Sequence, residues 1–558
     1  MISMDGNELH KIFETLAPLS DKGANEPLSQ ALSLLFQRLE QLEEENARLQ
    51  AENQHLRDEI NRLKGEQGTP DIRGNTRKSR DISSEKERKH REPKKEKKSK
   101  AKKHNIVIDR VEVCRVDKAT LPNDAEFKGY ESVIIQEIRI HTDNVEYKKE
   151  VYYSASEKKC YVGQLPAEMS GEFGHGVRSL VCTLKYVANM SEPKIAEFFA
   201  NFGIAISQPT ISRILTKEQH DFHHEKAQIF RAGLGTTRYQ QIDDTVIRVN
   251  GQNQYVQIVS NPYYTAYFTV SHKDRLTVLD ILLCGQERTY CFNHEAFTLL
   301  EEFRVSQAIM GRLRALTDDA MLSEAEMLAV LDTLFPDPAQ GKNTRVRILE
   351  AGAIASYHQS DEIPVVDVLV SDDAPQFKKL TKAQGLCWIH EGRHYKKLLP
   401  CVPLHKDELE RFLERFWAYY GKLAEYKEQP TVEQAEALAV EFDELFSTVT
   451  DYTSLAERIE KSRVKKDELL TVLSYPDLPL HNNNSEVGAR VEKRRQDVSL
   501  QLKTKEGTEA KDAFQTITQT ARKLGVSAYA YIYDRISKNF RLPSFATLIE
   551  QRGGPQLE

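Results

Sequence analysis

Three acidic positions are the residues best suited to do chemistry in this sequence. Asp243 lies in the stretch Gln-Ile-Asp-Asp-Thr, Asp372 follows the apolar run Val-Leu-Val-Ser, and Glu486 follows three asparagines and a serine. Three carboxylates can hold two Mg²⁺ ions roughly 3.5–4 Å apart, so that one ion activates an attacking oxygen and the other stabilises the leaving oxygen. Magnesium suits such all-oxygen ligand sets. The sequence therefore predicts a site for two Mg²⁺ (or Mn²⁺) ions.

Two of these carboxylates occur in doublets, which leaves their assignment open. Asp244 follows Asp243, and Asp373 follows Asp372. Because neighbouring residues of a strand face opposite sides, either member of a pair could point at the metal ions. A single aspartate after a strand more often forms a turn or a cap. The occurrence of all three carboxylates in this order is what favours a metal site.

The residues around Glu486 predict the start of a helix. Asn482, Asn483, Asn484 and Ser485 are residue types that cap helices, and the positive end of the helix dipole favours an ionised carboxylate in the first turn. A cationic run follows on the same helix, namely Arg490, Lys493, Arg494 and Arg495. A carboxylate beside a basic helix indicates a metal ion next to a polyanion, although a capped helix with a solvated basic face would look the same.

A mixed α/β sheet is the predicted frame for the two aspartates. Residues 237–271 read as three strands, and Asn250-Gly251 between the first two is a strong hairpin signal. A helix at 273–283, a buried strand from 365 to Asp372 and a short strand at 385–389 follow. This is the order of a ribonuclease H-like sheet, in which the first and fourth strands are neighbours, so Asp243 and Asp372 should converge. Helical stretches at 284–352 and 394–475 interrupt the sheet, and helices return at 508–537.

Residues 176–217 predict a helix-turn-helix. Ser191 with Pro193 begins one helix, Gly203 lies in the turn, and Ser207 begins a second helix. The second helix would be the one that reads DNA, and its side chains suited to bases and phosphates are Gln208, Thr210, Ser212 and Arg213. A plain helical hairpin would show the same pattern.

Leucines spaced seven apart predict a coiled coil near the N-terminus. The d positions are Leu35, Leu42, Leu49, Leu56 and Leu63, and the a positions are Leu32, Leu39, Asn46, Asn53 and Ile60. Buried asparagines at a positions cost stability but fix the register and favour a parallel dimer. The alternative is a helix that packs on its own domain.

Two segments separate this helix from the helix-turn-helix. Residues 67–104 contain too few apolar residues for a core, and residues 73–103 carry 15 Lys or Arg against 5 Asp or Glu, although the whole chain has a net charge of −6. We expect a disordered cationic tether that attracts phosphates, unless it is only a solvated linker. Residues 105–165 predict three or more strands. Cys114 and Cys160 have no partners at ligand spacing, so no zinc is expected there.

Composition limits the class of protein. A 558-residue chain with 40% hydrophobic and 29% charged residues fits a multidomain globular protein. The seven cysteines are scattered, which favours reduced thiols in a cytosol. The N-terminus has no signal-peptide pattern, and no stretch approaches ~18 uninterrupted apolar residues. We therefore expect a cytoplasmic protein without a membrane partner.

Four motifs make this sequence resemble the transposases of the insertion-sequence-66 family. They are Asp243-Asp244-Thr245, where members usually read Asp-Glu-Thr; Ser371-Asp372; Cys387-Trp388-x-His390-x-x-Arg393; and Asn482-Asn483-x-x-Glu486 with Arg490. The resemblance implies a leader helix, a zinc-binding module, a helical DNA-binding region and a core with the catalytic triad Asp243, Asp372 and Glu486. Residues 105–165 lack the family's paired Cys-x-x-Cys sites, and the stretch 284–352 is absent from shorter members.

These patterns divide the chain into predicted domains. They are a leader (1–30), a coiled coil (31–66), a basic linker (67–104), a β-rich module resembling a degenerate zinc-binding domain (105–165), a helical DNA-binding region (166–228), a ribonuclease H-like core (229–510) and a C-terminal helical segment (511–558). Near the core, Trp388 could stack on an unpaired base or pack in the interior. Further candidates for DNA contact are Arg393, Lys396, Arg490 and Arg494.

The resemblance implies that the function is DNA transposition, by a bacterial-type, nucleoid-associated protein. The site would hydrolyse a strand at the element end, and the freed 3′-hydroxyl would then attack target DNA. A dimer fits because two DNA ends must be brought together. Two alternatives stay open: a catalytically silent DNA-binding protein derived from such an enzyme, and a ribonuclease H-like nuclease without strand transfer.

Overall fold

The computed structural model describes most of the chain. The described residues are 26–63, 106–117, 121–122, 125–138, 140–166, 171–217, 219–317, 320–337 and 340–553. The predicted basic tether, residues 67–104, lies outside them.

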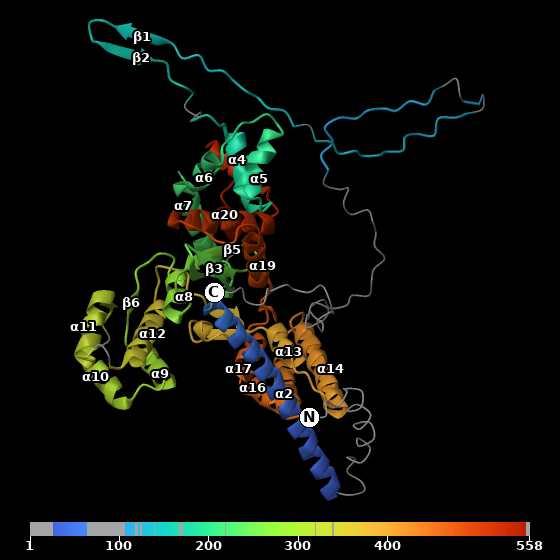
Figure 1. The fold of residues 1–558 in the computed structure, drawn as a ribbon, viewed down its shortest axis with the longest axis vertical. Coiled ribbons are helices and arrows are strands. Elements are labelled where there is room, and N and C mark those ends of the chain that lie inside the picture. Colours follow the sequence, from blue (N-terminus) through green and yellow to red (C-terminus); the bar gives the residue numbers. More distant parts are fainter. Residues whose placement is uncertain are drawn as a thin grey trace.

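A five-stranded mixed sheet forms the centre of the molecule (Figure 1). Its strands are β3 (Tyr239–Val249), β4 (Gln252–Ser260), β5 (Thr265–Val270), β8 (Val368–Ser371) and β9 (Ala383–Leu386), in the order β5-β4-β3-β8-β9. The pairs β3–β4 and β4–β5 are antiparallel, whereas β3–β8 and β8–β9 are parallel. Asn250 and Gly251 join β3 to β4 with positive φ angles of 48° and 77°, as the predicted Asn-Gly turn requires.

One long helix covers the exposed edge of this sheet. Side chains of α20 (Lys505–Lys523) at successive turns, Asp512, Thr516 and Thr520, accept hydrogen bonds from backbone N–H groups of β5 at 2.7, 3.1 and 3.4 Å. An edge strand with free N–H groups is prone to pair with another chain. The helix therefore satisfies the edge by side chains instead of by another strand.

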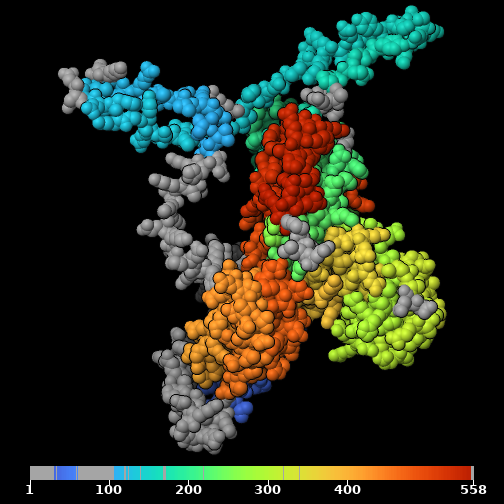
Figure 2. Space-filling view, turned by 180° about the vertical axis from the view of Figure 1, so that it is seen from behind, coloured from blue at the N-terminus to red at the C-terminus, as the bar shows by residue number. Residues whose placement is uncertain are grey.

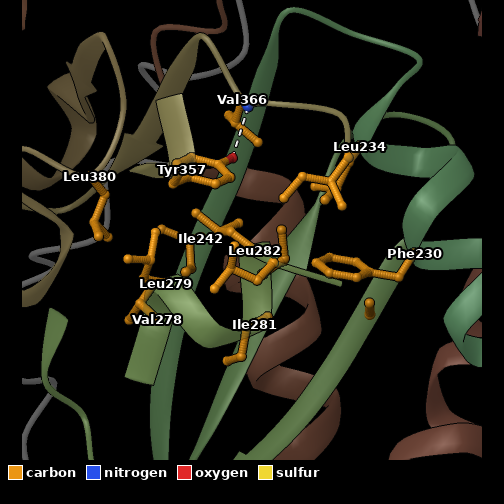
Figure 3. Close-up of a cluster of buried hydrophobic side chains, with 14 of the residues drawn as sticks. Phe230, Leu234, Ile242, Val278, Leu279, Ile281, Leu282, Tyr357, Val366 and Leu380 are labelled. Atoms are coloured by element: carbon orange, nitrogen blue, oxygen red, sulfur yellow. Dashed lines mark hydrogen bonds between the residues drawn. The ribbon is translucent and has the colours of Figure 1, made fainter. Parts of the chain in front are cut away.

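The main hydrophobic core lies between the sheet and helices α7 (His220–Leu234), α8 (Arg275–Leu282) and α12 (Lys342–His358). Figure 3 shows Ile242 of β3 beside Leu279 and Leu282 of α8. The hydroxyl of Tyr357 accepts a hydrogen bond of 2.9 Å from the Val366 N–H just before β8. Packing on this face fixes the position of β3, which carries Asp243.

Two helical lobes extend from the sheet in both views (Figures 1 and 2). The first contains β6 (Thr289–Tyr290), α9 (His294–Glu302), α10 (Gln307–Thr317), β7 (Leu322–Ser323), α11 (Glu324–Leu334) and α12. The second contains α13 (Trp388–Lys396), α14 (Pro403–Tyr426), α15 (Val432–Leu445), α16 (Thr453–Arg463), α17 (Lys466–Leu469) and α18 (Thr471–Ser474). They correspond to the helical stretches expected at 284–352 and 394–475, and the second has a hydrophobic core of its own.

Helices from both ends of the globular region pack against one another or against α7. These are α4 (His175–Tyr186), α5 (Glu192–Ala200) and α6 (Gln208–Thr216), with α21 (Ala528–Ile536) and α22 (Phe545–Gly553). Tyr186 of α4 stacks on Phe514 of α20 with ring centroids 5.0 Å apart. The predicted helix-turn-helix therefore rests directly on the C-terminal helices.

The prediction of a β-rich module at 105–165 is mostly wrong. Its described residues form one hairpin, β1 (Val151–Ser154) with β2 (Lys159–Val162), while 106–117, 125–138 and 140–150 have no regular secondary structure. Apolar side chains such as Val133 and Ile135 are exposed. Alternation of apolar and polar residues can favour strands, but strands also need partners to pair with, and a single hairpin is marginally stable.

The N-terminal heptads form one helix, α2 (Glu26–Leu63). Its first turns pack against another part of the same chain. Leu32 and Phe36 are buried against Val402. Glu40, 4% exposed, accepts hydrogen bonds of 2.8 Å from the N–H groups of Cys401 and Val402. The assignment of Leu32 to an intermolecular seam is therefore wrong, because that side chain has a partner in its own protein.

The later heptads remain available on the surface. Leu42, Leu49, Leu56 and Ile60 are 43%, 45%, 52% and 48% exposed. None of the helices in the described part of the chain is both long enough and apolar enough to cross a membrane.

Candidate active site

The strand register brings Asp243 and Asp372 together. Gln241 of β3 pairs with Val370 of the parallel strand β8. Asp243 and Asp372 each follow two residues later in the same direction, so the two carboxylates lie at the same level of neighbouring strands. This is the convergence that the sequence predicted.

Electrostatics link Asp243 to both Asp372 and Glu486. Burial is the largest cause that raises the pKa of Asp243, and the charge of Asp372 is the next. Glu486 and Asp244 raise it further, whereas the hydrogen bond from the Asp244 N–H (2.8 Å) lowers it, and the pKa reaches about 7. Carboxylates that interact in this way form one cluster, and such perturbed groups concentrate at functional sites.

The other members of the doublets have partners of their own. Asp244 accepts a hydrogen bond of 2.6 Å from Gln376 and lies 3.9 Å from the ammonium of Lys273. Asp373 forms ion pairs with Lys378 (2.6 Å) and Lys465 (2.5 Å). Burial opposes ionisation of Asp373, but these lysines outweigh it and lower the pKa. The arrangement favours Asp243 and Asp372 over their neighbours as metal ligands.

Glu486 is held beside the strands by polar contacts of its helix, α19 (Asn483–Val498). The side chain of Asn482 donates to the Ile242 carbonyl at 2.6 Å. The side-chain amide of Gln241 donates to the His481 carbonyl and accepts from the Asn484 N–H, both at 2.9 Å. The helix begins where the sequence predicted. However, Asn482 binds β3, and within the described residues its side chain makes no capping hydrogen bond.

Close packing fixes the same helix further along. A methyl group at Gly488 would lie 2.7 Å from the Ile258 side chain of β4, and the Tyr267 hydroxyl donates to the Gly488 carbonyl at 3.2 Å. Gly488 therefore lets α19 approach the sheet closely, which brings the first turn of the helix to Asp243.

Basic side chains surround the Glu486 carboxylate, which is 7% exposed. Arg393 lies 3.3 Å and Arg490 3.5 Å from its Oε2 atom, and His390 Nδ1 lies 3.7 Å from Oε1. Cys387, His390 and Glu486 also have possible metal-ligand atoms within 4.8 Å of one another. Arg393, however, contacts His390 Nε2 at 3.2 Å. Because arginine only donates, the proton of a neutral ring is then on Nδ1, which disfavours a metal ion there.

Trp388 does not lie on a DNA-facing surface. Its side chain is 0% exposed, its ring packs against Phe416 and Tyr419 at centroid distances of 5.4 and 5.5 Å, and its Nε1 donates to the Leu469 carbonyl at 2.8 Å. The prediction that it stacks on an unpaired base is therefore wrong. Its role is to join α13 to the core of the second helical lobe.

The cationic candidates divide by exposure. Arg490 and Arg494 are exposed, and Arg393 and Lys396 are half-buried. Arg495, expected on the same basic face, is buried and pairs with Glu492 at 2.7 Å. It stabilises the contact between α19 and α20, where Lys511 also lies 3.8 Å from Glu492.

The candidate residues of the predicted helix-turn-helix divide by exposure on α6 (Gln208–Thr216). Ser207 caps α6 by accepting from the Thr210 N–H at 3.4 Å. Gln208 and Arg213 are exposed, whereas Thr210 is half-buried and its hydroxyl accepts from Arg213 at 3.3 Å. Ile211 and Leu215 face inward and are buried. Of the predicted DNA contacts on this helix, Gln208 and Arg213 are therefore the ones on the surface.

Comparisons with known proteins agree with this geometry. Residues 354–510 match the model of the family described as "Transposase IS66 family". The chain is also 30% identical over 308 residues to "Uncharacterized protein y4jO" of Sinorhizobium fredii (strain NBRC 101917 / NGR234), a match covering 55% of this chain and 94% of that protein. The chain belongs to the IS66 transposase family. In this IS66-family transposase the matched range includes Asp372, the Cys387–Arg393 motif and Glu486, whereas Asp243 lies before it.

Sequence reasoning missed two residues of this IS66-family site. Gln241 connects β3 to α19, and Lys465 neutralises Asp373. A buried glutamine two positions before Asp243 on a strand was a weak signal for the first. Lys465 is 92 positions from Asp373, and no local pattern could have joined them.

Proposed function

We propose that this protein is a metal-dependent DNA transposase with a ribonuclease H-like core, which cleaves element ends and joins them to target DNA. The observation that carries the proposal is the register that sets Asp243 and Asp372 level on neighbouring strands, with Glu486 close enough to act on Asp243. Burial, and after it the charges of Asp372 and Glu486, raise the pKa of Asp243 to about 7. The sheet order β5-β4-β3-β8-β9 supports a ribonuclease H-like core.

The three carboxylates are of the residue type that suits divalent metal ions, although the group of described residues with possible ligand atoms within 4.8 Å of one another is Cys387, His390 and Glu486. Asp243 is half-buried with the like charges of Asp372, Glu486 and Asp244 beside it, an arrangement that a cation would relieve. Hard oxygen donors from Asp243, Asp372 and Glu486 suit Mg²⁺ or Mn²⁺. When bound, two such ions would polarise the attacking and leaving oxygens of an in-line displacement at phosphorus.

The protein's own residues would position the reacting groups. Gln241 and Asn482 hold α19 against β3, so that Glu486 stays beside the two aspartates. Exposed Arg490 and Arg494 would bind the DNA backbone next to the site. Half-buried Lys396, which lies over the Trp417 ring at 5.4 Å, would extend this basic surface.

Cleavage of DNA carrying the element ends tests the proposal. The purified full-length protein should nick such DNA with Mg²⁺ and not with EDTA, and should then join the freed 3′-hydroxyl to a second duplex. Binding without cleavage would favour the catalytically silent alternative. Cleavage without joining would favour the nuclease alternative.

We assign sequence-specific binding to α6, and Arg213 is the side chain that tests it. Arg213→Ala should reduce the difference in binding free energy between cognate and scrambled duplexes by about 1–3 kcal/mol. An arginine that binds a base discriminates against the wrong base by this amount. The slope of log K against log salt should change by at most about one phosphate contact. Binding titrations across a salt series, with cognate duplexes selected from a random pool, measure both quantities.

Two controls separate base recognition from charge. Lys217→Ala removes an exposed cation directly after α6 and should weaken all duplexes alike. Deleting 73–103 should do the same with a larger change in salt slope. An Arg213→Ala protein that loses affinity equally for both duplexes would limit Arg213 to phosphate contact.

The exposed part of the α2 seam carries the proposed homodimer. Asn46→Leu with Asn53→Leu should raise the stability of the oligomer and loosen its stoichiometry, because buried asparagines at a positions select dimers at an energetic cost. Sedimentation and thermal melting measure both effects. Gln54→Ala, off the seam, is the matched control. A monomeric wild-type protein would contradict the assignment.

A further inference from the structure

The Glu486 carboxylate is neutralised by the protein itself. Arg393 Nη2 lies 3.3 Å from Oε2, Arg490 lies 3.5 Å from the same oxygen, and His390 Nδ1 lies 3.7 Å from Oε1. Glu486 is nevertheless one of the three carboxylates proposed to hold metal ions. A metal ligand that is already paired with arginine has to exchange one cation for another.

Arg393 is the stronger of the two arginine partners. Its side chain is 22% exposed, compared with 53% for Arg490, so water screens its ion pair less. A second fork nitrogen, Nη1, donates to His390 Nε2 at 3.2 Å, which orients the guanidinium. Arg393 also belongs to α13, whose first residue, Trp388, is fully buried. The arginine is therefore held on a rigid helix directly against the site.

Within the described part of the chain, Asp243 and Asp372 form no comparable ion pair with an arginine or lysine. Burial and the charges of Asp372 and Glu486 raise the pKa of Asp243. The positive charges of Arg393 and Arg490 thus lie at the Glu486 side of the cluster. A divalent ion placed between the three carboxylates would meet the Arg393 guanidinium at this point, and two cations that share one carboxylate repel each other.

We propose that Arg393 is a metal-displaced latch: it neutralises Glu486 in the resting protein and transfers to a DNA phosphate when the metal ions bind. This rests on the proposed function. The planar guanidinium pairs with carboxylate and phosphate in the same bidentate manner, so the transfer exchanges one oxyanion for another. DNA that holds Arg393 removes the competitor of the metal, and metal that releases Arg393 provides a cation for DNA. By linkage, each ligand strengthens the binding of the other.

Mn²⁺ binding to the full-length protein, followed by the electron paramagnetic resonance signal of free Mn²⁺, tests the latch without catalysis. Arg393→Gln should bind Mn²⁺ about tenfold more tightly than the wild type in the absence of DNA, because a competing hydrogen bond to a charged group is lost. A mixed-sequence duplex should raise the Mn²⁺ affinity of the wild type and leave that of Arg393→Gln nearly unchanged. Cleavage by the variant should fall despite its tighter metal binding.

Matched variants identify which step fails. Arg490→Gln removes the more exposed partner of the same oxygen and should change Mn²⁺ affinity less. Equal or weaker Mn²⁺ binding by folded Arg393→Gln overturns the latch. Should that variant not fold, Arg393→Met also removes the charge while keeping an unbranched side chain, and a Mn²⁺ affinity no higher than that of the wild type overturns the latch equally. Asp372→Ala should lose Mn²⁺ binding; if it does not, the proposed metal site itself is wrong.

Discussion

Replacing Asp372 with alanine is expected to lower Mg²⁺-dependent cleavage by at least about a thousandfold, which corresponds to about 4 kcal/mol of activation free energy. Asp372 lies level with Asp243 on the neighbouring strand, so its removal would disrupt the ligand set. DNA binding should stay nearly intact, because a carboxylate that holds metal makes no favourable contact with phosphate. Cleavage assays and binding titrations on the same protein preparation measure the two properties.

Asp373→Ala is the matched control for this change. Asp373 directly follows Asp372 but pairs with Lys378 and Lys465. Its replacement should therefore decrease cleavage far less than Asp372→Ala does. Cleavage that survives in the double variant Asp372→Ala with Asp373→Ala would remove the proposed triad.

Asp372→Ala should lower cleavage, but it should not lower the stability of the metal-free protein. The pKa of Asp243 is about 7 in the folded protein, compared with ~3.9 for an unperturbed aspartate. A carboxyl whose pKa is raised on folding favours the folded state below pH ~3.9, and this contribution is lost as the pH rises to 7. Removing the charge of Asp372 should lower the Asp243 pKa. Without metal at pH 8, Asp372→Ala should therefore melt no lower than the wild type, whereas added Mg²⁺ should stabilise the wild type alone.

The predicted parts of the site are those that local patterns determine. Asn250-Gly251 defines the β3–β4 hairpin, and parallel pairing of β3 with β8 follows from the order of the strands. Together these place Asp243 beside Asp372. The asparagines before Glu486 mark the beginning of α19. The hairpin and the helix start depend on a few adjacent residues, and the pairing of β3 with β8 depends on the order of the elements along the chain, so an isolated sequence reveals all three.

Other features depend on partners far apart in the chain. Leu32 and Leu39 fit a dimer seam and an intramolecular contact equally well, because both need the same apolar side chain; the structure places Leu32 against Val402. Arg495 belongs to a basic run, but Glu492 and Lys511 enclose it in a buried network. Periodicity indicates which side chains are apolar and which faces they share, but it does not identify what covers them.

For Trp388, too, the sequence did not identify what covers the side chain. Its substitution should have the largest effect on the free energy of unfolding. Trp388→Ala is expected to lower the free energy of unfolding by about 3–5 kcal/mol, as for other large buried aromatic residues. The indole is 0% exposed, packs against Phe416, Tyr419 and Phe442, and donates to the Leu469 carbonyl. Chemical denaturation followed by circular dichroism measures the loss.

Trp388→Phe and Trp417→Phe serve as the controls. Phenylalanine at 388 retains most of the ring packing but leaves the Leu469 carbonyl without the indole donor, so the loss should be smaller, about 1–3 kcal/mol. Trp417 is half-buried beside Gly392, and its replacement should cost less than the loss of Trp388. A role in base stacking predicts the reverse: Trp388→Ala would weaken binding to single-stranded DNA by about 1–3 kcal/mol with little change in unfolding. Because the ring is enclosed by the second lobe's core, we expect the DNA affinity of the folded variant to stay close to that of the wild type.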